Sequence, residues 1–395
     1  MQRFLISALL VCGVLQAETV VVLPFFNHAK SQNLDWIGES IAEAVQDSLA
    51  SEGLLVLGRG DRLEAFRRQS LRPGAEITHA SIIKVGESLD ASQVVYGYYE
   101  LLPAGPDSPP SKGSLRITAR VLDLKHTRQS TAFSEMGALE DLASIQVRLG
   151  WQVLEELSPK TAPPEDEFLK ARPQVRVDAV ENYVRGLLAT APEQRQRFFL
   201  QAARLDEHYS QPCYQLGKAY WEKKEYKLAE TWLARVARSD QHYLESQFFL
   251  GLSRYRNGDF GGAEEAFQVV AASVPLNEVY NNLGAAEARR GNFTAAAASF
   301  RKALEGDSGD PDYHFNLGYA LWRSGQSTAA VESFRAAAER NPADTEATMM
   351  LGRALRGDAA PAKGSPAEPK FDDRLRLKTD YEETAYRQLQ AELKK

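Results

Sequence analysis

A leucine-glycine pair recurs at an almost constant interval through the second half of the chain. The glycines of successive pairs are separated by 34, 33, 34 and 34 residues. This is the period of a helix-turn-helix solenoid, in which each unit packs mainly on its neighbours. The spacing therefore predicts a stack of helix pairs. The five pairs are Leu216-Gly217, Leu250-Gly251, Leu283-Gly284, Leu317-Gly318 and Leu351-Gly352.

Other positions recur in phase with these glycines. An alanine follows each of the first four by twelve residues, and a leucine or phenylalanine follows by sixteen. Small residues let two antiparallel helices cross closely, while the larger side chain fills the wedge toward the next repeat. A further glycine in three units predicts a tight turn between the helices. These positions are Ala229, Ala263, Ala296 and Ala330, then Leu233, Phe267, Phe300 and Phe334, and finally Gly258, Gly291 and Gly325.

These residues resemble tetratricopeptide repeats. The resemblance implies an all-α superhelical solenoid over residues 177–356, whose first helices line a concave surface that binds a protein or peptide partner. A shortened unit is expected first, and the opening helix of an incomplete unit is expected last. The four clear repeats are expected at 210–243, 244–276, 277–310 and 311–344.

The positions that face the concave surface in this family form the candidate partner-binding groove. They combine aromatic rings with arginine and asparagine, a composition that suits peptide binding because rings give contact area and amides can hold an extended backbone. Packing of the rings between helices, or a solvated polar face, are the alternatives. The lysines of a carboxylate clamp are missing, so that ligand class is not expected. The candidates are Tyr214, Lys218, Trp221, Phe248, Tyr255, Asn281, Asn282, Arg289, Phe315, Asn316, Tyr319, Trp322 and Arg323.

Residues 18–158 show a different pattern, in which short β-branched runs alternate with amphipathic helices. The β-branched run within residues 19–25 is stopped by Pro24 and is typical of a buried strand. Strands that first alternate with helices and then follow one another predict an α/β domain with a mixed sheet covered by helices. Further strands are expected at 53–57, 94–102, 115–124 and 129–135, and helices at 37–49, 61–69, 81–89 and 139–157.

Four short motifs of this domain resemble the amino-terminal domain of TolB-like proteins and the related CsgG- and FlgO-type exported bacterial domains. The resemblance implies an envelope-associated protein-interaction module without a catalytic site. The β-propeller that follows this domain in TolB has no counterpart here, so the partners of TolB are not implied. The motifs lie at residues 22–25, 35–42, 94–97 and 115–123.

The start of the chain predicts export. Residues 1–17 combine Arg3, an apolar core and Ala17 at a cleavage position, which is the pattern of a signal peptide. We therefore expect a periplasmic protein. Lipidation of Cys12 and association with the outer membrane are the alternative, although Val11 is larger than the residue that a lipoprotein signal has before its cysteine.

The remaining segments are expected to connect and end the chain. Residues 159–176 and 357–370 are rich in proline, alanine or glycine and are predicted to be linkers. Residues 371–395 are predicted to form a helix that caps the incomplete last repeat, since a solenoid end needs covering. Docking of this segment in its own groove and recruitment of a partner are the alternatives. The stripe behind the helix prediction is Tyr381, Ala385, Leu389 and Leu393.

No catalytic, cofactor or metal site is expected. Residues 58–63 open a helix after a strand, but Leu63 takes the place of the third glycine of a dinucleotide-binding turn. The six histidines are scattered, and Cys213 has no cysteine partner after signal removal. A net charge of -6 lacks the basic excess of a nucleic-acid-binding protein.

The leading hypothesis is a non-enzymatic exported adaptor that mediates protein-protein interactions in the bacterial envelope. A lipid-anchored outer-membrane assembly factor is one alternative. A nucleotide-responsive sensor that uses the first domain is another.

Overall fold

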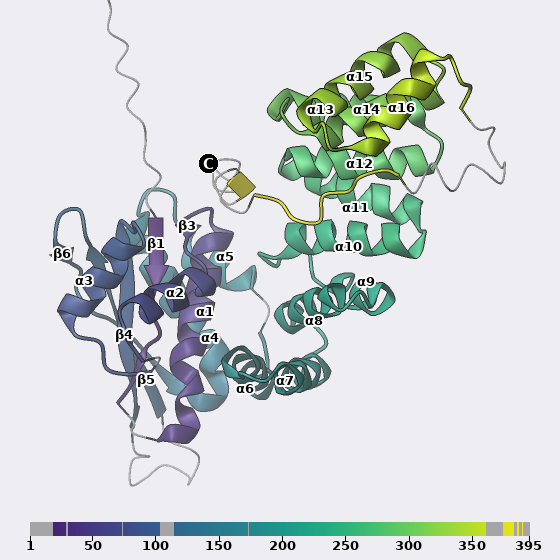
Figure 1. Ribbon diagram of the computed structural model, residues 1–395. Coiled ribbons are helices and arrows are strands. Elements are labelled where there is room, and N and C mark those ends of the chain that lie inside the picture. Colours follow the sequence, from purple (N-terminus) through teal and green to yellow (C-terminus); the bar gives the residue numbers. More distant parts are fainter. Residues whose placement is uncertain are drawn as a thin grey trace, which may run out of the picture.

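The computed structural model describes residues 19–28, 31–72, 74–102, 114–172, 174–360, 374–382, 385, 386 and 389. An α/β domain comes first, and a curved row of helix pairs follows it (Figure 1). This confirms the predicted fold class. The predicted signal peptide lies outside the described residues. Within them, no helix is both long and apolar enough to span a membrane.

The first domain is built on a mixed sheet. Its strand order is β3-β1-β4-β5-β6, with β2 also paired to β4 and β7 to β5. Strand β1 runs parallel to β3 and β4, whereas β4 and β5 form a long antiparallel pair. The strands are β1 Thr19–Val22, β2 Phe26–Asn27, β3 Leu55–Val56, β4 Gln93–Leu102, β5 Ser114–Asp123, β6 Arg128–Gln129 and β7 Phe133–Ala138.

Helices cover both faces of the sheet. Val20 and Val22 join one core together with α1 (Trp36–Ser51) and α4 (Leu142–Leu157). Val21 and Leu23 point the other way, into a core made with α2 (Arg59–Arg68) and α3 (His79–Ser88). A strand buried on both faces is apolar at every position, which explains the uninterrupted β-branched run at the start of this domain. Short 3₁₀ turns at Gln32–Leu34 and Leu139–Asp141 precede α1 and α4.

Two expectations for the first domain and its exit need correction. The strand predicted at 129–135 is divided between β6 and β7, which pair with different parts of β5. The predicted linker at 159–176 contains a helix, α5 (Glu165–Lys170). Phe168 of this helix is buried, and the guanidinium of Arg172 lies 3.4 Å from its ring centroid. Proline content indicated a linker, but this one aromatic side chain anchors the segment on α4.

The solenoid consists of helix pairs that stack in chain order. The pair α6/α7 stands where the shortened unit is expected, and α16 is the unpaired helix of the last unit among the described residues. The helices are α6 Val177–Leu188, α7 Pro192–Leu205, α8 Ser210–Glu222, α9 Tyr226–Leu233, α10 Tyr243–Asn257, α11 Phe260–Ser273, α12 Asn277–Arg289, α13 Phe293–Gly306, α14 Pro311–Arg323, α15 Ser327–Arg340 and α16 Thr345–Leu355.

Turn geometry follows the repeat. The second glycines of three units, Gly258, Gly291 and Gly325, have φ angles of 84°, 85° and 79° between their two helices. The first clear unit has Lys224 at the equivalent position, with φ of 62°. The left-handed conformation is costly for a residue with a side chain, so three of these four turns use glycine.

The C-terminal segment differs from the prediction. Residues 374–382 contain no helix, whereas the described residues beyond them, 385, 386 and 389, are all helical. The segment crosses the concave side of the solenoid and runs toward the first domain (Figure 1). The predicted capping helix is therefore wrong over 374–382. Leu375 and Leu377 alternate with basic residues, and this period of two suits an extended chain. Most of the second predicted linker, 361–370, lies outside the described residues.

The contact between a repeat glycine and the ring below it can be tested by Gly284→Ala. The added methyl carbon would lie 2.8 Å from Cε1 of the fully buried Phe300. Overpacking costs about 1–3 kcal/mol, against a gain of about 1 kcal/mol for replacing a helical glycine, so we expect the free energy of unfolding to fall by up to about 2 kcal/mol.

The matched control is Gly352→Ala at the equivalent position of α16. There the nearest atom to the added carbon is Nη1 of Arg356, at 3.5 Å. We expect this variant to be as stable as the parent protein or slightly more stable in urea denaturation. Equal destabilisation by both substitutions would contradict the proposed role of the contact.

Candidate peptide-binding groove

Three asparagines lie at the centre of the concave surface. Asn281 and Asn282 belong to α12 and Asn316 to α14, and all three are fully buried. Asn282 and Asn316 occupy the same position of consecutive repeats, two residues before the repeat glycine. Residues 374–378 lie directly over them, so the groove holds a segment of its own chain.

The asparagine side chains bind backbone groups of alternate residues. Asn316 accepts the N–H of Arg376 at 3.0 Å and donates to its carbonyl at 2.8 Å. Asn282 accepts the N–H of Lys378 at 2.8 Å and donates to its carbonyl at 2.7 Å. Each amide thus exchanges two hydrogen bonds with one residue, as a neighbouring β-strand would.

Asn281 connects these two contacts. Its Nδ2 donates to the carbonyl of Arg376 at 2.8 Å, and its Oδ1 accepts from Nδ2 of Asn316 at 2.8 Å. A weaker bond of 3.3 Å runs from Asn281 to Oδ1 of Asn282. A buried polar group without a partner costs about 1–3 kcal/mol, so this network favours an occupied groove. Because the bonds reach only the backbone, they require an extended chain and specify no side chain.

Acidic residues at the starts of α14 and α16 contact the basic side chains of the segment. Arg376 lies 3.1 Å from Asp312 and 2.6 Å from Asp344, measured between nitrogen and oxygen. Lys378 lies 2.6 Å from Asp310 and 2.8 Å from Asp312. Glu346 additionally pairs with Arg374. The alternate basic residues of the segment thus all point toward one acidic side of the groove.

The ionisation of these groups reflects their mutual contact. Burial raises the pKa of Asp312, but hydrogen bonds and charges from Lys378 and Arg376 outweigh burial, so the pKa lies below its ordinary value. Burial lowers the pKa of Lys378, and the carboxylates of Asp310 and Asp312 outweigh it, so this pKa is raised. Asp312 and Lys378 are therefore both held in their charged forms at neutral pH.

Aromatic rings complete the floor of the groove. The Arg376 guanidinium lies 3.8 Å from the ring centroid of Phe315, and the Lys378 ammonium lies 5.2 Å from that of Tyr313. Phe248 meets Tyr381 edge-on at 5.1 Å. Stacking of a cation on a ring adds attraction beyond the ion pairs. Leu375 is buried between the basic positions.

The predicted groove residues separate into two groups. Asn281, Asn282, Asn316, Phe315 and Phe248 contact the C-terminal segment. The other candidates contact neighbouring repeat residues, and Tyr214 and Lys218 also line a pocket together with Tyr381 and Tyr386 of the segment. Arg289 lies over Phe260, Arg323 over Phe293, and Arg323 also donates to the Tyr319 hydroxyl. Tyr255, Trp221, Tyr214 and Lys218 contact Phe260, Tyr226, His242 and Glu245, respectively.

Trp322 is the candidate least suited to partner contact. Its side chain is 2% exposed, and its ring nitrogen donates to the carbonyl of Asp358 at 2.8 Å, beyond the end of α16. It therefore ties the last helix to α14. Substitution of Trp322 would disturb this packing, so the asparagines are the better positions for testing the groove.

The acidic residues were missed from the sequence. Asp310 and Asp344 accept backbone N–H groups at the starts of α14 and α16, which identifies them as helix caps. Their second carboxylate oxygens bind Lys378 and Arg376. One sequence signal could have identified them. Basic and apolar residues alternate at 374–378, so an extended chain would place its basic side chains on one side, where a row of acidic residues could bind them.

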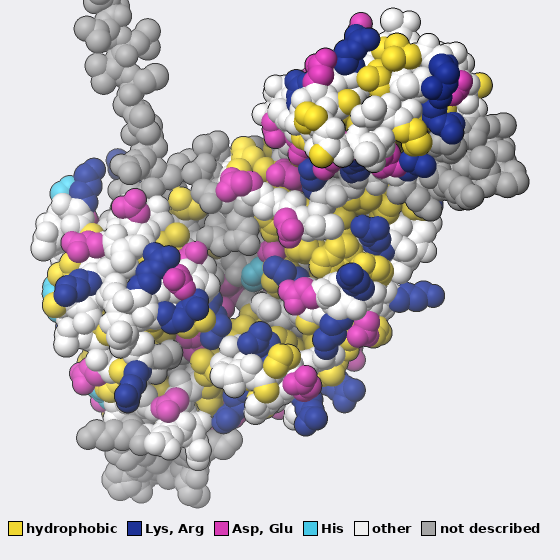
Figure 2. Space-filling view, viewed as in Figure 1, with side chains coloured by type: hydrophobic (Ala, Val, Ile, Leu, Met, Phe, Trp, Pro, Cys, Tyr) yellow, Lys and Arg dark blue, Asp and Glu magenta, His cyan; other side chains and the backbone are white. Residues whose placement is uncertain are grey.

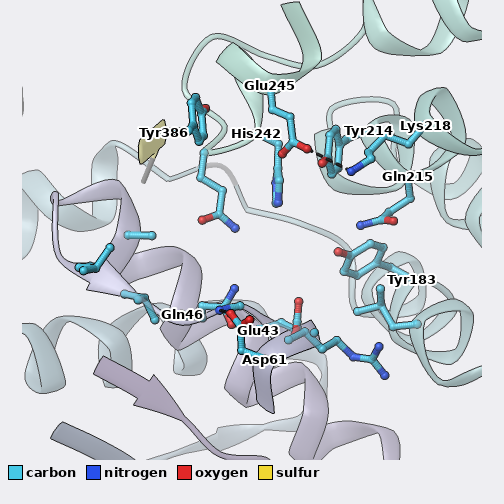
Figure 3. A pocket seen from close by; sticks show the side chains of 18 of the residues that line it. Glu43, Gln46, Asp61, Tyr183, Tyr214, Gln215, Lys218, His242, Glu245 and Tyr386 are labelled. Atoms are coloured by element: carbon cyan, nitrogen blue, oxygen red, sulfur yellow. Dashed lines mark hydrogen bonds and ion pairs between the residues drawn. The ribbon is translucent and has the colours of Figure 1, made fainter. Parts of the chain in front are cut away.

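A polar pocket of about 480 Å³ lies where the C-terminal segment reaches the first domain. Figure 3 shows Glu43 and Asp61 of that domain on one side and Lys218 and Glu245 of the solenoid on the other. Lys218 pairs with Glu245 at 3.1 Å, and Tyr386 forms part of the wall. The groove therefore opens toward the junction of the two domains.

A half-buried carboxylate lies beside this pocket. Asp47 of α1 accepts hydrogen bonds from the side chains of Gln211 and Gln241 in the solenoid. Burial raises the pKa of Asp47 well above its ordinary value, although the charge of His242 partly opposes this. Burial lowers the pKa of His242 itself, but Asp240 and other nearby carboxylates outweigh it and raise the pKa to about 9.

The rest of the described chain offers little for chemistry. Within it, no group of three or more His, Cys, Asp or Glu is placed to hold a metal. Cys213 is buried, and burial raises the pKa of its thiol to about 11. The turn at residues 58–63 is a helix cap, in which Asp61 accepts the N–H of Gly58 at 3.0 Å. Charges of both signs are interspersed on the face that Figure 2 shows.

Family models of the tetratricopeptide repeat match residues 210–243, 248–311 and 315–362. No curated protein matches the chain. Among solved structures, MamA from Desulfovibrio magneticus RS-1 is 23% identical with a TM-score of 0.37, over 41% of this chain and 92% of that one. YrrB, described as a TPR protein with an unusual peptide-binding site, is 20% identical with a TM-score of 0.41, over 52% and 97%.

The pH dependence of stability tests the domain junction. Since the pKa of His242 rises from about 6.5 to about 9 on folding, its stabilisation is complete below pH 6.5 and is lost as the pH rises toward 9. We expect the melting temperature to fall over this range. His242→Gln, which stays neutral, should show a smaller change, and an unchanged pH dependence in this variant would assign the effect to other groups.

The repeat period, the glycine-ring contacts and the matched family models agree along the second half of the chain. Residues 210–355 thus form a solenoid of tetratricopeptide repeats.

Proposed function

We propose that this protein is a non-enzymatic scaffold of the bacterial cell envelope, which holds extended segments of partner proteins in the groove of its solenoid. The observation that carries this proposal is the pair of asparagines that bind both backbone groups of residues 376 and 378. Such contacts resemble the addition of a β-strand, a recurring mode of peptide recognition. The asparagines are side chains of helices, so the solenoid positions them before a ligand arrives.

The first domain would hold a second partner. Two of its TolB-like motifs lie at the central strands: residues 22–25 begin at the last residue of β1 and continue beyond it, and residues 94–97 lie in β4. Asp47 joins this domain to the solenoid through Gln211 and Gln241. Two partners bound to one chain would meet at a raised effective concentration, which is how a scaffold promotes assembly without catalysis.

Mass spectrometry can test the proposed export of the chain. Cleavage after Ala17 would leave Glu18 as a free amino terminus. We expect mass spectrometry of the protein purified from its native cells to find this terminus. An acylated Cys12 would favour the lipid-anchored alternative, and an intact Met1 would contradict export through this signal.

Partner capture in intact cells tests the groove. The double variant Asn281→Ala/Asn316→Ala removes backbone-binding amides, and crosslinking followed by purification should lose partners that the parent protein retains. Asn257→Ala is the matched control, because Asn257 is exposed at the end of α10 and donates to Glu230. If the parent protein and both variants return the same partners, the groove is not the binding surface.

A further inference from the structure

The groove contains acidic side chains that are not needed to bind a peptide backbone. Four acidic residues, Asp310, Asp312, Asp344 and Glu346, line one side of it. We infer that the groove prefers partner segments in which basic and apolar residues alternate, and that residues 374–382 act as a tethered competitor for the same site. This inference rests on the proposed function and adds to it the chemistry of the partner and a means of control.

The charge preference follows from the spacing of the contacts. Side chains of an extended chain alternate between two sides, so Arg374, Arg376 and Lys378 point together. Arg376 reaches Asp312 and Asp344 at once, and Lys378 reaches Asp310 and Asp312. An acidic residue at either position would meet two carboxylates within a half-buried site. A neutral segment would leave the four acidic residues without these partners.

The apolar preference comes from the intervening positions. Leu375 is 6% exposed, and Leu377 packs partly against the same core. Further along, the Tyr381 ring lies 5.1 Å from Phe248 and 5.1 Å from Tyr386. The preferred segment therefore reads basic, apolar, basic, apolar, basic, followed at a short distance by an aromatic residue.

The tether follows from chain length. Eighteen residues separate Leu355, the end of α16, from Arg374. They can span up to about 60 Å. Arg374 itself pairs with Glu346 in the first turn of α16, so the segment starts close to the helix that precedes it. A covalent link of this length gives an effective concentration on the order of millimolar. A partner must compete with that concentration. The observed affinity for a partner therefore depends on how much more tightly the partner segment binds the groove than residues 374–382 do.

The occupant also reaches the domain junction. Tyr386 is 8% exposed and lines the polar pocket beside Glu43 and Glu245 (Figure 3). Displacement of the segment would therefore remove part of the wall between the two domains as well as clear the groove. Partner binding in the solenoid would in this way change a surface that includes the first domain.

The test uses the full-length protein and a fluorescein-labelled peptide with the sequence of residues 374–382. The variant Arg376→Glu/Lys378→Glu should release the segment from the acidic side of its groove, and we call it the released variant. We expect this variant to bind the peptide on the order of 10- to 100-fold more tightly than the parent protein, because the tethered competitor is removed. Arg301→Glu/Arg335→Glu, at exposed positions of α13 and α15, is the control for net charge and should behave as the parent.

A second peptide tests the charge preference. It carries glutamate in place of the residues equivalent to Arg376 and Lys378, and it should bind the released groove at least about 10-fold more weakly, because each new carboxylate faces the acidic side. Hydrogen exchange supplies a check without a ligand. The amide groups of residues 376 and 378 should be protected in the parent protein and exchange freely in the released variant, with unchanged protection in α12 and α14.

Each outcome bears on a different step. Equal binding of both peptides would overturn the charge preference. Equal affinity of the parent and released proteins for the first peptide would overturn the competitor. A parent dimer that becomes monomeric in the released variant, by light scattering, would place the segment in the groove of a second copy and overturn tethering in one chain. No binding of either peptide to any variant, with α12 and α14 still protected, would contradict the proposed function itself.

Discussion

The close approach of the two helices in each repeat is the constraint on which the groove depends. Rings such as Phe300 and Phe334 lie against Gly284 and Gly318, where a Cβ atom would come within 2.8 Å of them. This contact fixes how the first helix of each unit faces its neighbours. Consequently Asn282 and Asn316, which precede these glycines by two residues, present their amides side by side. Successive repeats then match alternate residues of one extended chain.

The sequence predicted the parts of the structure that depend on local pattern. The solenoid period, the turn glycines and the mixed sheet follow from spacing, glycine chemistry and β-branched runs. Burial of Phe168 depends on a surface formed by distant residues, which composition could not reveal. The extended path of residues 374–382 had a local signal in the alternation of leucine and basic residues, but the groove that holds the segment is formed by distant residues. The asparagines were found because their repeat position is local. Asp312 and Glu346 were missed, since a charge in the first turn of a helix has an ordinary explanation.

The two domains are connected by polar contacts that differ in kind from the packing within each. Asp47 is half-buried at the junction and is held by amide groups of Gln211 and Gln241, while His242 and Asp240 lie nearby. Such a junction depends on every member having a partner. It is more sensitive to protonation than an apolar interface of similar extent. The solenoid is thus attached to a particular face of the first domain, next to the end of the occupied groove.

Asp310 and Asp344 each serve the fold with one oxygen and the bound segment with the other. Replacing either one by alanine would weaken basic recognition and also remove a helix cap worth about 1 kcal/mol. Selection for stability alone would therefore oppose the loss of Asp310 or Asp344, even where no basic ligand is bound. The ligand preference of this groove would be retained over evolutionary time even during periods when no partner is present to select for it.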